Sequence, residues 1–171
     1  MKFVLRVADD AVALATCGPF VIVIWRGVPT RARLEAGLAL MEEHAAAIGP
    51  PIGVISVVEE GSPPPSTEDM VFIQSSFGMM SRVIAAMAGV FETTGELEEA
   101  RVAREMIGGA MGRRVELKQC FAVEEACTWI VPRIVPGAER PYGRALARTI
   151  EKIRACITAP PRAKRRAAAR R

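Results

Sequence analysis

Phe20-Val21-Ile22-Val23-Ile24-Trp25 is an unbroken apolar run with the length of one strand. Such a run is typical of a strand buried on both faces, because a strand with one face in water alternates apolar and polar side chains. Arg26-Gly27-Val28-Pro29 then ends the strand, and Thr30 is a suitable N-cap for a helix. The run therefore predicts a central strand of a sheet that is followed directly by a helix.

Outward from this run, strands and helices are expected to alternate. In chain order we expect strands over Lys2–Val7 and Ala11–Thr16 before the run, and after it a helix over Arg31–Ile48, a strand over Ile52–Val58, a helix over Thr67–Ser81, a strand over Val83–Phe91, a helix over Thr93–Met111, an edge strand over Arg114–Phe121 and a short helix over Val123–Ile130. Strands that alternate with helices imply parallel pairing in the middle of one sheet. The predicted fold is α/β, with a single mixed sheet of about five to six strands, helices packed on it and an extra C-terminal helix.

The chain divides into a domain and two C-terminal segments. Residues 1–132 hold the predicted α/β domain, residues 138–158 an amphipathic helix, and residues 159–171 a basic tail. The helix carries one apolar stripe, formed by Leu146, Ile150, Ile153 and Ile157. Such a stripe must be covered. Either the helix packs on the domain, or it pairs with its copy in a homodimer, and the sequence leaves both alternatives open.

The basic charge of the chain is concentrated in the tail. The net charge is +4, and the basic residues of the tail are Arg162, Lys164, Arg165, Arg166, Arg170 and Arg171, with no acidic residue among them. A tail of this kind is expected to be disordered and solvated, or to attach to nucleic acid or another anionic surface. Without aromatic residues for base stacking, nucleic-acid binding would be weak, non-specific and steeply dependent on salt.

Composition argues against an enzyme. The only histidine is His44, which disfavours zinc hydrolases and multi-histidine metal sites, and the four cysteines form no CxxC pair. We therefore expect no catalytic residues, no cofactor and no metal.

No export signal or membrane helix is expected near the N-terminus. Arg6, Asp9 and Asp10 interrupt what would have to be the apolar core of an export signal. The uncharged run Ala11–Trp25 is too short for a membrane helix and is broken by Gly18-Pro19. A cytoplasmic location without a membrane span is expected, with reduced and mostly buried cysteines.

Two short stretches, together with the order of elements, resemble a known family. Trp25-Arg26-Gly27-Val28-Pro29-Thr30 joins a strand to the first helix, and Phe121-Ala122-Val123-Glu124-Glu125-Ala126-Cys127-Thr128-Trp129-Ile130 forms the start of a later helix. Over residues 10–132 the chain resembles the STAS superfamily, in particular its SpoIIAA-like, anti-sigma-factor-antagonist-like branch. The resemblance implies a small regulatory or binding domain without catalytic machinery, which acts on a protein partner whose identity the sequence does not give.

Some members of that family are switched by phosphorylation of a serine in a D-S-S-G motif at the start of a helix. The nearest string here is Gln74-Ser75-Ser76-Phe77-Gly78, in which a glutamine replaces the acid. The predicted helix also places both serines inside the helix and not at its start. Ser75 and Ser76 are therefore candidate phosphoacceptors, with ordinary serines on a helix face as the favoured alternative.

Two further sites follow from residue type and position. Methionine adapts to irregular gaps and occurs on promiscuous binding surfaces, so Met79 and Met80 are a candidate partner surface, with core filling as the default. In α/β sheets ligands gather near strand ends. Trp25, Pro29 and Val58 could therefore border an apolar pocket for a small molecule or lipid, with plain packing as the alternative. The expected functions are thus partner binding, small-molecule or lipid binding, or attachment through the tail.

Overall fold

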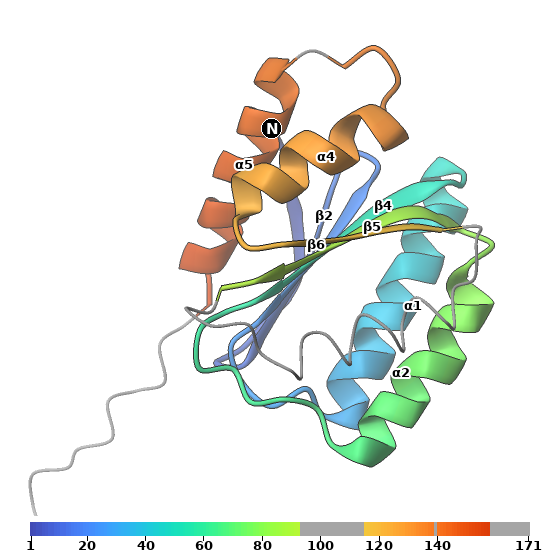
Figure 1. Cartoon of the computed structure of the whole chain (residues 1–171), viewed down its shortest axis with the longest axis vertical. Coiled ribbons are helices and arrows are strands. Elements are labelled where there is room, and N and C mark those ends of the chain that lie inside the picture. Colours follow the sequence, from blue (N-terminus) through green and yellow to red (C-terminus); the bar gives the residue numbers. More distant parts are fainter. Residues whose placement is uncertain (93–114, 139, 158–171) are drawn as a thin grey trace, which may run out of the picture.

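The computed structural model describes residues 1–92, 115–138 and 140–157. In this part of the chain, one six-stranded mixed sheet carries four helices (Figure 1). The elements in chain order are β1 Val4–Ala8, β2 Val12–Cys17, β3 Phe20–Trp25, α1 Arg31–Ile48, β4 Ile52–Val58, α2 Thr67–Met80, β5 Ile84–Phe91, β6 Glu116–Cys120, α4 Val123–Ile134 and α5 Arg140–Ala155. The prediction of an α/β fold with one mixed sheet is confirmed. The helix expected over Thr93–Met111 lies outside the described residues.

The strands lie side by side in the order in which they occur along the chain. β1, β2 and β3 are antiparallel neighbours, and β3, β4, β5 and β6 are parallel neighbours. Trp25 pairs with Val58, and Val58 pairs with Phe91. The carboxyl ends of β3, β4 and β5 are therefore level with one another, and the residues that follow these strands meet at one edge of the sheet.

Helices cover both faces of the sheet, with α1 and α2 on one side and α4 and α5 on the other (Figure 1). All six residues of β3 are buried, as its unbroken apolar sequence predicted. Phe20, Ile22 and Ile24 belong to the core under α4 and α5. Val21, Val23 and Trp25 belong to the core under α1 and α2. This alternation assigns every residue of the parallel strands to one of the two faces.

The C-terminal end of α4 lies four residues beyond the predicted one. Helix α4 does not end at Ile130 but continues to Ile134, with Pro132 inside it. Proline in a helix removes one hydrogen bond to the carbonyl four residues earlier, here that of Thr128. The buried Ile130 and Val131 hold the last turn against the sheet.

The apolar stripe of α5 is buried within the chain itself. Leu146, Ile150 and Ile153 have no exposed surface, and Ile157 is 4% exposed. These residues pack with α4 and the sheet in one core. The sequence left open whether this helix packs on the domain or pairs with a second copy. In the structure, α5 packs on the sheet beside α4. Within this chain, α4 and the sheet therefore cover the stripe, and pairing with a second copy stays a prediction.

Candidate functional site

Among the residues that the structure describes, an apolar cavity of about 210 Å³, open on one side, lies between α1, α2 and the face of the sheet formed by β3 to β6. Leu34, Leu38 and Met41 from α1 form one wall, and Met70, Ile73 and Phe77 from α2 form another. The loop Ser62–Pro65, which follows β4, borders the cavity as well. Leu34 and Leu38 keep part of their surface accessible although they lie on the inner face of α1, because they border this space.

The structure brings together the three residues that the sequence suggested for an apolar pocket. Trp25 and Val58 are register partners at the ends of β3 and β4, and Pro29 lies in the loop between β3 and α1. All three line the cavity. It lies toward the carboxyl ends of parallel strands, which is where open α/β sheets bind their ligands.

The floor of the cavity contains residues that sequence reasoning missed. Ser56 on β4 pairs with Gly89 on β5, and Gly89 pairs with Gln119 on β6, so the three form one row across the sheet. All three line the cavity and are partly accessible on inner or neighbouring strands. Ser56 could have been found from the sequence, because alternate side chains of a strand share one face and Ser56 is two residues before Val58. Gln119 could be added only once β6 was known to lie beside β5.

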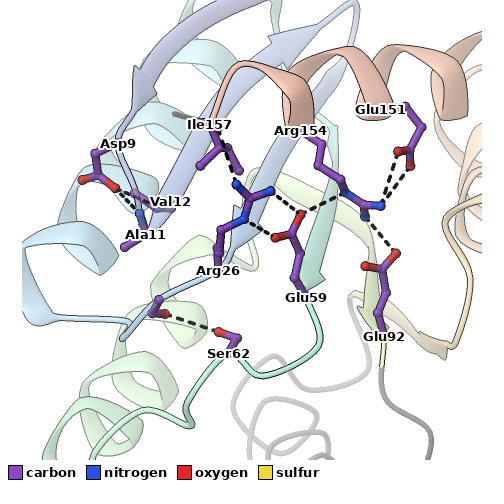
Figure 2. Close-up of polar contacts among 11 residues, drawn as sticks. Asp9, Ala11, Val12, Arg26, Glu59, Ser62, Glu92, Glu151, Arg154 and Ile157 are labelled. Carbon is purple, nitrogen blue, oxygen red and sulfur yellow. Dashed lines mark hydrogen bonds and ion pairs between the residues drawn. The ribbon is translucent and has the colours of Figure 1, made fainter. Parts of the chain in front are cut away.

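A close backbone contact fixes the loop that leads to Pro29. A Cβ atom on Gly27 would lie 2.5 Å from the Cβ of Ala11, so only glycine fits there. The amide of Gly27 donates a hydrogen bond to the carbonyl of Ala11 at 3.0 Å. The hydroxyl of Ser62 donates to the carbonyl of Gly27 at 3.3 Å (Figure 2). The loops after β3 and β4 are thus tied to each other at the mouth of the cavity.

A cluster of charged side chains lies on the opposite face of the same sheet edge (Figure 2). Arg26, Glu59 and Glu92 each follow one of the parallel strands, and Arg154 of α5 reaches down to them. The Arg26 side chain binds both oxygens of Glu59, at 2.5 and 3.2 Å, and this hydrogen bonding raises the pKa of Arg26. Because the carboxylates of Glu59 and Glu92 are engaged by arginines, this cluster fastens α5 to the sheet.

The candidate phosphoacceptors lie within α2, whose N-cap is Ser66. Ser75 is exposed, and its hydroxyl donates to the carbonyl of Phe72 at 2.9 Å. Ser76 is 2% exposed. Of the two serines, only Ser75 presents its side chain to solvent.

The structure separates the two methionines of the candidate partner surface. Met79 is 70% exposed, whereas Met80 is 3% exposed and belongs to the core under α1 and α2. The prediction that Met80 forms part of a surface is wrong, because adjacent helical residues point about 100° apart and only one of the two can face outward here.

The remaining polar residues do not assemble a metal centre in the described part of the chain, where no group of three His, Cys, Asp or Glu side chains could hold an ion. The Nε2 of His44 lies 2.8 Å from the carbonyl of Gly18 and ties α1 to the turn between β2 and β3. Cys17, Cys120 and Cys127 are buried and unpaired, and Cys156 is exposed.

Among the described helices, none is long and apolar enough to cross a membrane. The basic tail residues lie outside the described residues, so attachment through the tail stays a prediction.

Comparison of the chain with models of protein families, with curated proteins and with solved structures found no match. The resemblance to the STAS superfamily therefore stays a prediction from sequence.

Proposed function

We propose that this chain is a non-enzymatic, SpoIIAA-like regulatory domain that binds a small apolar molecule in the cavity between α1, α2 and the sheet. The observation that carries the proposal is a cavity of about 210 Å³ with apolar walls beside the carboxyl ends of parallel strands. The family part of the proposal is supported by the two sequence stretches quoted above and by the close contact that requires Gly27.

The chemistry of the cavity supports binding more than catalysis. Among the described residues, the polar side chains that face it from the floor are the hydroxyl of Ser56 and the amide of Gln119. Neither group titrates near neutral pH, so neither serves as a general acid or base. Apolar cavities with a few placed polar groups are the usual form of small-molecule sites.

Occupancy of the cavity is tested by filling it. Leu38→Trp places a larger side chain in the wall of the cavity, whereas Ile48→Trp is a matched change on the same helix at a residue 49% exposed. We expect neutral one-ring compounds such as p-xylene to bind the wild-type chain and the Ile48→Trp variant in calorimetry. Binding should be lost in Leu38→Trp. Equal binding to all three proteins, or none to the wild type, would overturn the proposal.

Binding of a protein partner is the second candidate, and the observation that favours it is the outer surface of α2. Val71 is 62% exposed and Met79 is 70% exposed, with the exposed Ser75 between them along the helix. The wild-type chain should recover one particular protein from the host lysate. Changing both Val71 and Met79 to lysine should abolish the recovery of that protein. The same protein should still be recovered with the Glu68→Lys variant on the first turn of α2. Recovery that is unchanged by the double variant would argue against this surface.

A further inference from the structure

We infer that the C-terminal helix α5 regulates binding in the cavity, because Arg154 and Glu59 hold in place the two loops at its mouth. This inference rests on the proposed function, since it names how binding in the same cavity would be controlled. Arg154 and Glu59 act in it as positioning residues, which hold the loops and do not line the cavity.

The ends of the parallel strands carry two kinds of side chain on opposite faces of the sheet. Trp25, Val58 and Phe91 are the last residues of β3, β4 and β5, and all three line the cavity. Successive side chains of an extended chain point to opposite faces, so the next residue of each strand end belongs to the ionic cluster that holds α5 (Figure 2). These next residues are Arg26, Glu59 and Glu92. The cavity and the cluster are thus one residue apart at three neighbouring strand ends.

Backbone hydrogen bonds hold these strand ends together. The amide of Glu59 donates to the carbonyl of Trp25 at 2.9 Å, and the amide of Glu92 donates to the carbonyl of Val58 at 3.0 Å. The parallel ladder therefore continues one residue beyond the strands. A displacement of Glu59 acts on the backbone at Trp25 as well as on Val58, its own neighbour in the chain.

A short series of contacts leads from α5 to the loops at the mouth. The guanidinium of Arg154 lies 3.0 Å from the carboxylate of Glu59. The carbonyl of Glu59 accepts a hydrogen bond from the amide of Ser62 at 3.0 Å, which closes a tight turn. The hydroxyl of Ser62 donates to the carbonyl of Gly27, in the loop after β3. Because Ser62 and Pro29 line the cavity, the series joins α5 to both loops of the mouth.

Both loops are also fastened to the end of α5 by charge. The side chain of Glu59 is 12% exposed and that of Arg154 is 22% exposed, so salt and water screen this pair less than they screen a surface pair. Arg26, which begins the loop after β3, binds the same carboxylate and reaches the carbonyl of Ile157 beyond α5. Movement of the end of α5 away from the sheet would therefore loosen both loops and weaken binding in the cavity.

The first measurement is the affinity of the full chain for p-xylene, the probe of the proposed function, by isothermal titration calorimetry. Coupling between two sites in a protein is typically about 5- to 150-fold. Arg154→Met, which detaches α5 from Glu59 and Glu92, should therefore bind p-xylene at least about 5-fold more weakly than the wild type. The matched control is Glu151→Gln, which removes the partner that Arg154 has on α5 itself and should leave the affinity unchanged.

The second measurement needs no variant, because coupling between two sites is reciprocal. Hydrogen exchange of the wild-type chain, followed by mass spectrometry, is compared with and without saturating p-xylene. The probe should slow exchange at least about 5-fold in residues 150–157, at the end of α5 that carries Arg154, although it binds on the other face of the sheet. Residues 141–147, at the other end of α5, report any stabilisation of the fold as a whole and should be slowed less.

Three results would each overturn the inference while the binding of p-xylene upholds the proposed function. The first is an unchanged affinity in Arg154→Met, and the second is an equal loss of affinity in Glu151→Gln. The third is exchange in residues 150–157 that p-xylene slows no more than exchange in residues 141–147. If p-xylene does not bind the wild-type chain, both the inference and the proposed function are overturned.

Discussion

The guanidinium of Arg154, in the last turn of α5, lies 3.0 Å from the carboxylate of Glu59, the residue that follows β4 (Figure 2). Arg26, which follows β3, binds the same carboxylate and also reaches the carbonyl of Ile157 at 3.4 Å. Arg154 reaches Glu92, which follows β5, at 2.8 Å. Because the three strands end level, these side chains form one continuous ionic cluster that joins the C-terminal helix to the edge of the sheet.

Glu59→Gln should destabilise the fold more than a loss of one surface ion pair. The side chain of Glu59 is 12% exposed, and the change leaves the guanidinium groups of both Arg26 and Arg154 without their shared charge. We expect the free energy of unfolding to fall by about 1–3 kcal/mol, which is below the loss seen for fully buried pairs because both arginines are partly exposed.

The matched control is Glu151→Gln. Glu151 also pairs with Arg154, but its side chain is 51% exposed, so its loss should change stability by about 0–1 kcal/mol. Urea unfolding followed by circular dichroism measures both variants. Equal losses in the two would mean that the cluster does not act through Glu59.

Ile150→Ala tests whether the stripe of α5 belongs to the core of one chain. Ile150 has no exposed surface and packs among residues of α4 and the sheet. We expect a loss of about 2–5 kcal/mol, with an unfolding midpoint that does not depend on protein concentration. Arg148→Ala, at an exposed position of the same helix, should stay within about 0.5 kcal/mol of wild type. A midpoint that rises with protein concentration in the wild type would indicate that the stripe is buried between two chains.

Much of the fold could be predicted because local signals agreed with one another. The apolar run of β3, the period of α1 and the Ser66 cap of α2 each predicted an element that the structure contains. The late end of α4 could not be predicted, because proline ends most helices and only the burial of Val131 shows why this helix continues. The position of α5 could not be predicted either, since an apolar stripe does not say which surface covers it.

The candidate site could be predicted only where the chain order brings its residues together. Trp25, Pro29 and Val58 follow from the rule that strand ends gather at one edge. Ser56 and Gln119 become neighbours of Gly89 only through the register of β4, β5 and β6, and no local pattern encodes that register. The contact between Glu59 and Arg154 was missed for the same reason, because it joins a loop to a helix far along the chain.

Two glycines with opposite surroundings give opposite predictions for substitution by alanine. On Gly37, in the middle of α1, a Cβ atom would lie 3.9 Å from Leu14, which is an ordinary contact. Gly37→Ala should therefore stabilise the fold by about 0.5–1 kcal/mol through helix propensity. On Gly53, in β4, a Cβ atom would lie 2.8 Å from both Ile134 and Phe20. Gly53→Ala should destabilise the fold by about 1–3 kcal/mol through overpacking. Thermal unfolding distinguishes the two, and a stabilised Gly53→Ala would contradict the packing of α4 on β4.

The buried thiols predict both a labelling pattern and a loss of stability at alkaline pH. Burial raises the pKa of Cys127 from its ordinary value of 9.0 to about 12, that of Cys120 to about 11, and that of Cys17 as well. The thiolate is the reactive form. At pH 8, iodoacetamide should therefore modify only the exposed Cys156 in the folded chain, and all four cysteines in urea, as counted by mass spectrometry.

The direction of the pH effect follows from the raised pKa values. Above pH 9 the unfolded chain releases thiol protons that the folded chain still holds, so the unfolded state binds fewer protons and stability falls as pH rises. The contribution of Cys127 is fully present below its unfolded pKa of 9.0 and is lost as pH rises toward about 12. Cys127→Ala should flatten this decline in urea unfolding between pH 9 and 12, whatever its effect on stability at pH 7. Cys156→Ala, at the exposed cysteine, should leave the decline unchanged. A decline of the same slope in both variants would mean that groups other than the buried Cys127 thiol cause it.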